Sequence, residues 1–159
     1  YYSNDLIGTQ IGGALKNIYA IAAGIAEGLN LGENAKSALI SRSFAEMTRY
    51  AKKFKADKNT LFGLSGLGDL ILTCSSTNSR NTQFGIKLAS SKYNNFLDLL
   101  KSQEVTEGYY TVKAVYNISK KKKIDMPIME SVYNILYKQH DLKVEISNLL
   151  NRPLKDEKI

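Results

Sequence analysis

The chain has 159 residues, of which 43% are hydrophobic, 9% aromatic and 23% charged, and this composition excludes an intrinsically disordered or a collagen-like protein. A single Cys and a single His exclude a disulfide framework and a metal site built from several thiolates or imidazoles. The formal net charge of +7 favours an anionic partner, which could be a phosphate ester, a nucleotide, nucleic acid or an anionic membrane surface.

The first predicted element is a long helix from Leu6 to Leu29. Its apolar residues recur every three or four positions and predict one buried stripe, made of Ile7, Ile11, Leu15, Ile18, Ala22 and Ile25. A second stripe, at spacing four, carries Gly8, Gly12 and Lys16. Several glycines inside a helix predict either close packing of another helix or a ligand lying against bare backbone beside Lys16. Because Lys16 interrupts the apolar stretch, no segment reaches the ~20 residues that a membrane span requires.

A second amphipathic helix is predicted from Glu33 to Lys55, and the polar residues 57–60 are expected to end it. The glycine-rich stretch from Gly63 to Asp69 is predicted to be a flexible turn that presents the Asp69 carboxylate. A nucleotide-binding loop is excluded there, because the flanks are helical in pattern and Gly68 is followed by Asp69 instead of by Lys-Ser or Lys-Thr.

The segment Ser79-Arg80-Asn81 is the best candidate anion site. It combines a bidentate guanidinium with a hydroxyl and an amide, and a helix starting near Asn81 would add free backbone N–H groups. This set suits a phosphate monoester. A capping segment with one surface arginine accounts for the spacing equally well.

Three more helices are predicted in the C-terminal part. The whole chain is therefore predicted to be all-α and without internal repeats, with a strand remnant at residues 1–2 as the one exception to the helical pattern. The first opens at residues 106–108 and ends in the run Lys120–Lys123, which we interpret as a solvated helix end, with contact to anionic lipid or nucleic acid as the alternative. Asp125 is predicted to cap the second, with Pro127 in its first turn, and Asp141 to cap the third.

Lys16, Asp69 and Glu107 are the further candidates for chemistry. Partial desolvation on an apolar helix suits Lys16 to proton transfer, although periodicity alone favours a packed stem with its ammonium in water. Asp69 could hold a substrate hydroxyl or a lysine, and Glu107 could accept hydrogen bonds from a ribose or an amide; otherwise they are an ordinary turn residue and an ordinary first-turn acid. Cys74 is expected to be a small packing residue, and His140 is given no role.

Taken in order, six motifs resemble the C-terminal domain of bacterial NAD(P)-dependent glycerol-3-phosphate dehydrogenases. They are Gly12–Asn17, Gly66–Leu70, Ser79–Asn81, Glu107–Gly108, Met126–Ile128 and Arg152–Lys155. The resemblance covers the chain from about Asn4 to Lys155. It implies a multi-helix bundle like the C-terminal domain of 6-phosphogluconate dehydrogenase-like enzymes. It also implies the interconversion of dihydroxyacetone phosphate and sn-glycerol 3-phosphate with NAD(P)H, which supplies phospholipid synthesis in the cytoplasm.

The resemblance also assigns roles to individual residues. Lys16 matches the catalytic general acid and base of the family. The positions that match substrate-binding residues are Lys16, Asp69, Ser79, Arg80 and Asn81. The positions that match cofactor-binding residues are Arg80, Val105 and Glu107. No metal is implied.

The resemblance further implies that residues 1–159 form a single helical substrate-binding domain, and that NAD or NADP is bound mainly by an N-terminal Rossmann domain upstream of Tyr1. The chain alone is then expected to be catalytically inert, and a homodimer is left open. The alternatives are the C-terminal domain of a related hydroxyacid dehydrogenase and, in a different class, a basic helical nucleic-acid-binding module. The spread of basic residues along the chain argues against the second, as do tyrosines lying within helical patterns.

Overall fold

In the computed structural model, the described residues are 3–90 and 106–152, and they are helical throughout their regular structure. The elements in chain order are α1 (Leu6–Gly28), α2 (Glu33–Lys53), α3 (Lys58–Phe62), the π-helical turn η1 (Leu64–Gly68), α4 (Asp69–Ser75), α5 (Arg80–Ala89), α7 (Glu107–Lys122), α8 (Pro127–Lys138) and α9 (Leu142–Leu150). The predicted all-α class is confirmed for these ranges. The strand remnant proposed for Tyr1 and Tyr2 lies outside the described residues.

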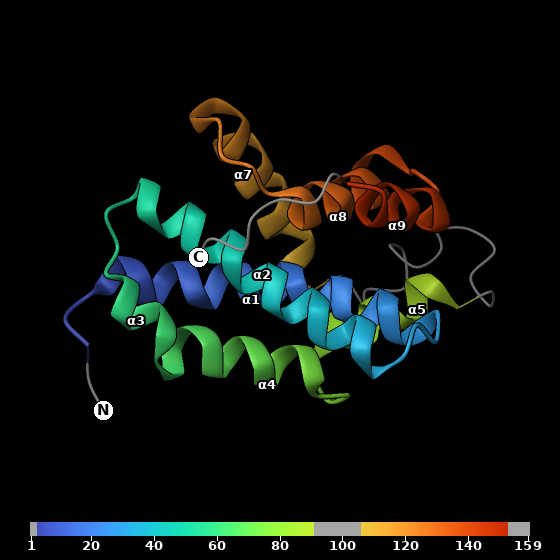
Figure 1. The fold of residues 1–159 in the computed structure, drawn as a ribbon, viewed down its shortest axis with the longest axis horizontal. Coiled ribbons are helices and arrows are strands. Elements are labelled where there is room, and N and C mark those ends of the chain that lie inside the picture. Colours follow the sequence, from blue (N-terminus) through green and yellow to red (C-terminus); the bar gives the residue numbers. More distant parts are fainter. Residues whose placement is uncertain (1–2, 91–105, 153–159) are drawn as a thin grey trace.

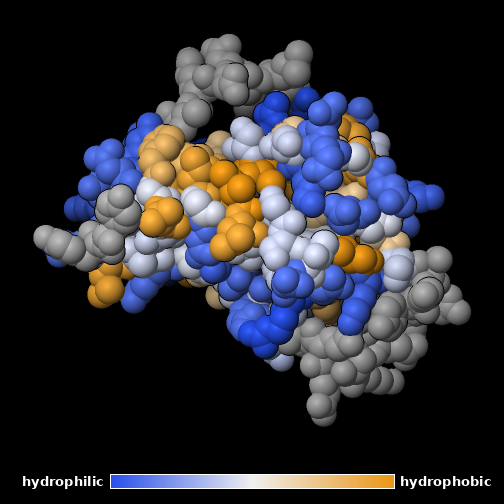
Figure 2. All heavy atoms as spheres, turned by 90° about the horizontal axis from the view of Figure 1, so that it is seen from below, coloured by the Kyte–Doolittle hydropathy of each residue, from blue (hydrophilic) through white to orange (hydrophobic). Residues whose placement is uncertain are grey.

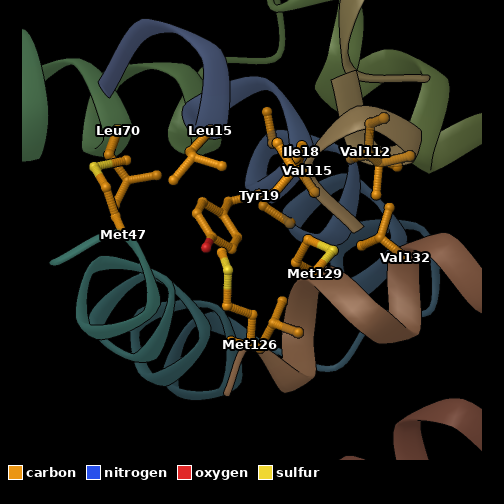
Figure 3. Packing of buried hydrophobic residues seen from close by; sticks show 14 of the residues in the cluster. Leu15, Ile18, Tyr19, Met47, Leu70, Val112, Val115, Met126, Met129 and Val132 are labelled. Atoms are coloured by element: carbon orange, nitrogen blue, oxygen red, sulfur yellow. The ribbon is translucent and has the colours of Figure 1, made fainter. Parts of the chain in front are cut away.

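Helix α1 runs through the middle of the bundle, and α2, α4, α5, α7 and α8 all contact it (Figure 1). Its residues Leu15, Ile18, Tyr19 and Ile21 are completely buried. Figure 3 shows the ring of Tyr19 surrounded by apolar side chains from α2, α4, α7 and α8 and from the N-cap residue of α8. Among them are Met47, Leu70, Val115, Met126 and Met129. The predicted stripe therefore belongs to the core at Leu15, Ile18 and Ile25, whereas its members Ile11 and Ala22 are partly buried and Ile7 is half exposed.

The glycines of α1 serve close packing. A Cβ atom on Gly12 would overlap the carbonyl oxygen of Ser65, so that η1 can lie directly on the backbone of α1 only because Gly12 has no side chain. In contrast, a Cβ atom on Gly13 would meet no heavy atom within 4 Å. Close packing of another element, the first of the two predictions for this stripe, therefore accounts for Gly12. The backbone at Gly13 instead faces open space one turn before Lys16.

The stretch from Gly63 to Asp69 is not the flexible turn that its glycines predict. It forms η1, which continues into α4, and Asp69 is the first residue of that helix. Gly66 packs against the backbone of Leu61, where any side chain would overlap main-chain atoms. Tertiary packing on α1 and α3 therefore overrides the local preference of glycine for loops.

Two helix boundaries also differ from the predictions. Helix α2 ends at Lys53, and the expected break at residues 57–60 is instead the start of α3, whose N-cap is Asp57. Asp125 does not cap α8: Met126 holds the N-cap position and makes no side-chain cap bond, because the buried carboxylate of Glu46 in α2 accepts the free N–H groups. The prediction that Asp141 caps the last helix is confirmed.

Hydrophobic side chains gather on the face formed by α3, η1 and α4, the lower side of Figure 1 (Figure 2). The large exposed ones from these elements are Phe62, Leu64, Ile71 and Leu72. Within the described ranges, every helix is too short or too polar to cross a membrane.

Candidate active site

Lys16 and Asp69 meet between α1 and α4. The Nζ atom of Lys16 lies 2.6 Å from Oδ2 of Asp69, and the two side chains are 24% and 31% exposed. The ammonium thus stands at the surface on the open side of Gly13 and is held by a carboxylate. Because an ammonium has three N–H donors, the pair leaves Lys16 able to donate to a further acceptor.

Thr73, one helical turn after Asp69, lies beside this carboxylate. Its hydroxyl donates to the main-chain oxygen of Asp69 at 2.6 Å and lies 3.3 Å from Oδ1. Sequence reasoning missed Thr73, although its spacing of four from Asp69 places both on one helix face once the segment is known to be helical.

Asn17 and Asn81 join three helices beside this pair. The amide of Asn81 donates to Oδ1 of Asn17 at 3.1 Å, and its own Oδ1 accepts the backbone N–H of Gly108 at 3.0 Å. Asn81 is buried, and a Cβ atom on Gly108 would crowd both asparagines. Both ends of the Asn81 amide are therefore used within the protein. Asn17 was also missed, although it directly follows Lys16.

Ser79 and Arg80 stand at the N-terminus of α5. The Ser79 hydroxyl caps the helix by accepting the backbone N–H of Thr82 at 3.3 Å, as the capping interpretation expects. Arg80 is the first helical residue, one position earlier than predicted. Its guanidinium pairs with Glu107 at 2.5 Å, with side-chain exposures of 77% and 53%. This ion pair is accessible to a ligand, and exposed pairs of this kind are worth about 1 kcal/mol or less.

A continuous set of contacts connects the two charged pairs. The adjacent residues Lys16 and Asn17 hold α4 and α5 respectively, and the Thr82 hydroxyl of α5 donates to the main-chain oxygen of Thr73 in α4 at 2.9 Å. The structure therefore brings six of the seven predicted site residues to one junction of α1, α4, α5 and α7. The seventh, Val105, lies outside the described residues.

Two other reactive residues take no part in this site. Cys74 is buried in the core, and burial raises the pKa of its thiol to about 12, which keeps it protonated and inert as a nucleophile. His140 contacts Glu145 in α9 at 2.7 Å. In the described ranges, no group of three or more His, Cys, Asp or Glu side chains could hold a metal ion.

Comparison with known proteins links this arrangement to one family. Residues 5–147 match the family described as NAD-dependent glycerol-3-phosphate dehydrogenase C-terminus. The glycerol-3-phosphate dehydrogenases [NAD(P)+] of Staphylococcus haemolyticus and Staphylococcus aureus are 43% and 45% identical over 157 residues, which is 99% of this chain and 47% of each relative. The chain thus spans about half the length of the curated relatives it matches.

Solved structures give the same result. The crystal structure of a glycerol-3-phosphate dehydrogenase from Coxiella burnetii matches with a TM-score of 0.88 at 39% identity, over 96% of this chain and 46% of that one. The Saccharomyces cerevisiae glycerol-3-phosphate dehydrogenase matches with a TM-score of 0.80 at 28% identity, over 93% and 43%.

Proposed function

Since the chain belongs to the family of NAD-dependent glycerol-3-phosphate dehydrogenase C-terminal domains, we propose that it is the substrate-binding and catalytic half of an oxidoreductase that interconverts dihydroxyacetone phosphate and sn-glycerol 3-phosphate. One observation carries the proposal. The ammonium of Lys16 is fixed by Asp69 on an open helix face, at the junction where the N-terminus of α5 presents Arg80.

Lys16 acts on the reacting oxygen of the substrate. In the reductive direction it donates a proton to the oxygen that develops negative charge, and in the oxidative direction it accepts the proton of the hydroxyl. Asp69 holds the ammonium in place, and the Thr73 hydroxyl lies 3.3 Å from the other oxygen of that carboxylate. A proton donor fixed in this way loses little freedom when the substrate arrives.

The phosphate end of the substrate binds at the start of α5. Arg80 offers two parallel N–H donors, and the partial positive charge of the helix N-terminus adds to the attraction. Glu107 engages Nη2 of Arg80, so the remaining guanidinium N–H groups can donate to the phosphate, and the solvent exposure of this ion pair makes any rearrangement inexpensive. The phosphate contacts then position the carbonyl at the other end of the substrate beside Lys16.

The cofactor in this proposal is NAD or NADP, which supplies and removes the hydride. The residues of this chain that would touch it are Arg80, Glu107 and Val105. Both side chains of the Arg80–Glu107 pair are exposed and fit a dinucleotide. The guanidinium suits its phosphates, and the carboxylate suits its hydroxyl or amide donors. Most of the cofactor would be held by an N-terminal Rossmann domain, so that residues 1–159 act as one substrate domain and are inert alone. A role in supplying phospholipid synthesis in the cytoplasm follows from the same reaction.

The proposal is tested by supplying the proposed cofactor-binding half from a relative. This chain is joined to the N-terminal half of the Staphylococcus aureus relative, and the loss of NAD(P)H absorbance with dihydroxyacetone phosphate is followed for the joined protein and for this chain alone. We expect turnover in the joined protein only. A joined protein that is folded and binds NADH but does not reduce dihydroxyacetone phosphate would contradict the proposal, as would turnover by this chain alone.

A further inference from the structure

The net charge of the protein is concentrated at one end. Seven lysines belong to the C-terminal turns of α2 and α7 and to the residues that follow these turns: Lys52, Lys53, Lys55, Lys120, Lys121, Lys122 and Lys123. We refer to them as the lysine end. They account for the whole net charge of +7, because the other 15 Lys and Arg balance the 15 Asp and Glu. Basic residues are spread along the sequence, but the excess of positive charge corresponds in number to the seven lysines at these two helix ends.

The two helix ends lie next to each other. The Nζ atom of Lys122 in α7 lies 4.9 Å from the ring centroid of Phe54, which follows α2 directly. In Figure 1 the ends of α2 and α7 project from the same side of the bundle. Lys55 and Lys123 both adopt the left-handed conformation, with φ of 58° and 53°, and so turn the chain sharply at this end.

The acids of residues 3–90 and 106–152 do not neutralise the lysine end. Among the described residues, Lys120 alone of the seven forms an ion pair, with Glu130, while the nearby Asp125 pairs with Arg152. Each helix C-terminus contributes the equivalent of about half a negative charge. Several positive charges therefore remain at the surface, and at physiological ionic strength they act over about 8 Å.

An apolar groove adjoins the lysine end. It has a volume of about 240 Å³, and its lining is apolar apart from one glutamine and the hydroxyl of Tyr50: Ile7, Gln10, Ile11, Ala14, Leu15, Tyr50, Phe54 and Val115. Phe54 belongs to both features, since its ring lines the groove and faces the ammonium of Lys122. The side chain of Ile118 is also exposed on α7, two positions before the lysine run. Dense positive charge beside apolar surface is complementary to a ligand with anionic head groups and hydrocarbon tails.

In the part of the chain that the structure describes, the aromatic rings near the lysine end are already occupied and offer no stacking platform to a nucleic acid. The tyrosines of α7 and α8 already stack on one another, with Tyr116 and Tyr133 at 3.7 Å between ring centroids, and Lys120 and Lys138 lie over their faces. Binding of single strands depends on free aromatic faces, and arginine is the usual residue for bidentate contacts to individual phosphates. The two arginines near the lysine end already have partners, since Arg49 donates to the main-chain oxygen of Asp125 and Arg152 to its carboxylate.

We propose that the lysine end is a peripheral docking surface for an anionic lipid bilayer, with the seven lysines on the head groups and the adjoining groove and Ile118 against the upper part of the hydrocarbon. Such an attachment would hold the protein at a membrane surface without any segment crossing it. Each lysine next to an anionic bilayer strengthens partitioning about fivefold, so that the lysine end is sufficient for binding that salt can reverse.

The test is flotation of this chain with vesicles of phosphatidylcholine alone and with vesicles that contain about 30% phosphatidylglycerol. We expect binding to the second kind only, and its loss when NaCl is raised from about 0.05 to 0.5 M. The variant Lys53→Gln/Lys121→Gln/Lys123→Gln removes three exposed charges from the lysine end and should weaken partitioning by about 100-fold. Circular dichroism verifies that each variant is folded.

The matched control removes three exposed lysines elsewhere, as Lys58→Gln/Lys113→Gln/Lys143→Gln. It has the same net charge as the first variant and should bind the anionic vesicles at least 10-fold more strongly than that variant. Equal weakening of both variants would overturn the proposal, because only the total charge would then matter. It would also be overturned by a lack of binding to anionic vesicles at low salt, or by an oligonucleotide that displaces the vesicles at equal phosphate concentration.

Discussion

The carboxylate of Glu46 accepts the backbone N–H of Ile128 at 2.6 Å, across 82 positions of the sequence. Glu46 is 1% exposed, and its second oxygen accepts from the N–H of Met129 and from the hydroxyl of Tyr19. A single side chain of α2 thus replaces the local N-cap that α8 lacks and connects α1, α2 and α8 in the core. Since the start of α8 has no cap of its own, the stability of this region depends on that carboxyl group.

The first prediction concerns pH. Burial raises the pKa of Glu46 from its ordinary 4.5 to about 7, although the two backbone N–H groups act in the opposite direction. The folded protein therefore holds a proton that the unfolded chain releases near pH 4.5, so the contribution to stability is full below that pH and is lost as the pH rises through about 7. Urea unfolding should show the free energy of unfolding falling between about pH 5 and pH 8, by at most about 3 kcal/mol from this group.

Glu46→Gln is the control, because the amide cannot ionise but still offers one oxygen to the N–H of Ile128. We expect the pH dependence of the variant to be flatter than that of the parent over the same interval. The same slope for both proteins would show that another group is responsible.

The second prediction compares two adjacent glycines of α1. Gly12→Ala should destabilise the protein, by about 1–3 kcal/mol, because its methyl group would overlap the Ser65 carbonyl and push η1 away. Gly13→Ala meets no atom within 4 Å and should stabilise the helix by up to about 1 kcal/mol. Thermal unfolding of the two variants measures both effects, and a stability change of the same sign in both would show that the backbone contact does not constrain the fold.

The sequence predicted the fold well wherever local periodicity determines it. The apolar spacing of Leu15 and Ile18 and the cap at Asp141 are local features, and the structure agrees with both. The failures occur where distant partners override local preference. The glycines near Gly66 indicate a turn until the backbone of Leu61 is packed against them, and no local pattern reveals that Glu46 caps α8.

For the site, the residue types were predictable and their partners were not. Lys16 and Asp69 were recognised as candidates from their surroundings and from the family motifs, but their 2.6 Å contact joins residues 53 positions apart. Thr73 and Asn17 were missed because their importance lies in which site residues they contact, which only the packing of α4 and α5 on α1 reveals.

The third prediction is Lys16→Ala in the joined protein. Removal of the proposed proton donor should lower kcat by about 10²- to 10⁴-fold, the usual contribution of general acid–base catalysis. KM should change little, because the phosphate contacts remain. Steady-state kinetics measures both constants, and the circular dichroism spectrum and thermal unfolding of the variant verify that it is folded. A kcat within twofold of the parent value would remove Lys16 from the chemical step.

The fourth prediction is Arg80→Ala in the same protein. Loss of a charged, bidentate hydrogen-bond donor should raise KM for dihydroxyacetone phosphate by about 10- to 100-fold. Glu107→Gln is the matched variant, because it weakens the Arg80–Glu107 ion pair while leaving the guanidinium intact, and it should not raise KM for this substrate. A rise of similar size in both variants would mean that the ion pair, and not the phosphate contact, is what Arg80 provides.

The last prediction concerns the two lysines that follow α2 and α7 in the left-handed conformation. A side chain at such a φ costs about 1 kcal/mol relative to glycine, and glycine is the usual residue where a helix ends in this way. Lys55→Gly and Lys123→Gly should therefore each raise the midpoint of thermal unfolding, although each removes one charge from the lysine end. Lys121→Gly is the control, because Lys121 lies inside the last turn of α7 and the same change there should lower the midpoint. If Lys123→Gly lowers the midpoint as much as Lys121→Gly does, the Lys123 side chain must stabilise the end of α7 by more than its backbone conformation costs.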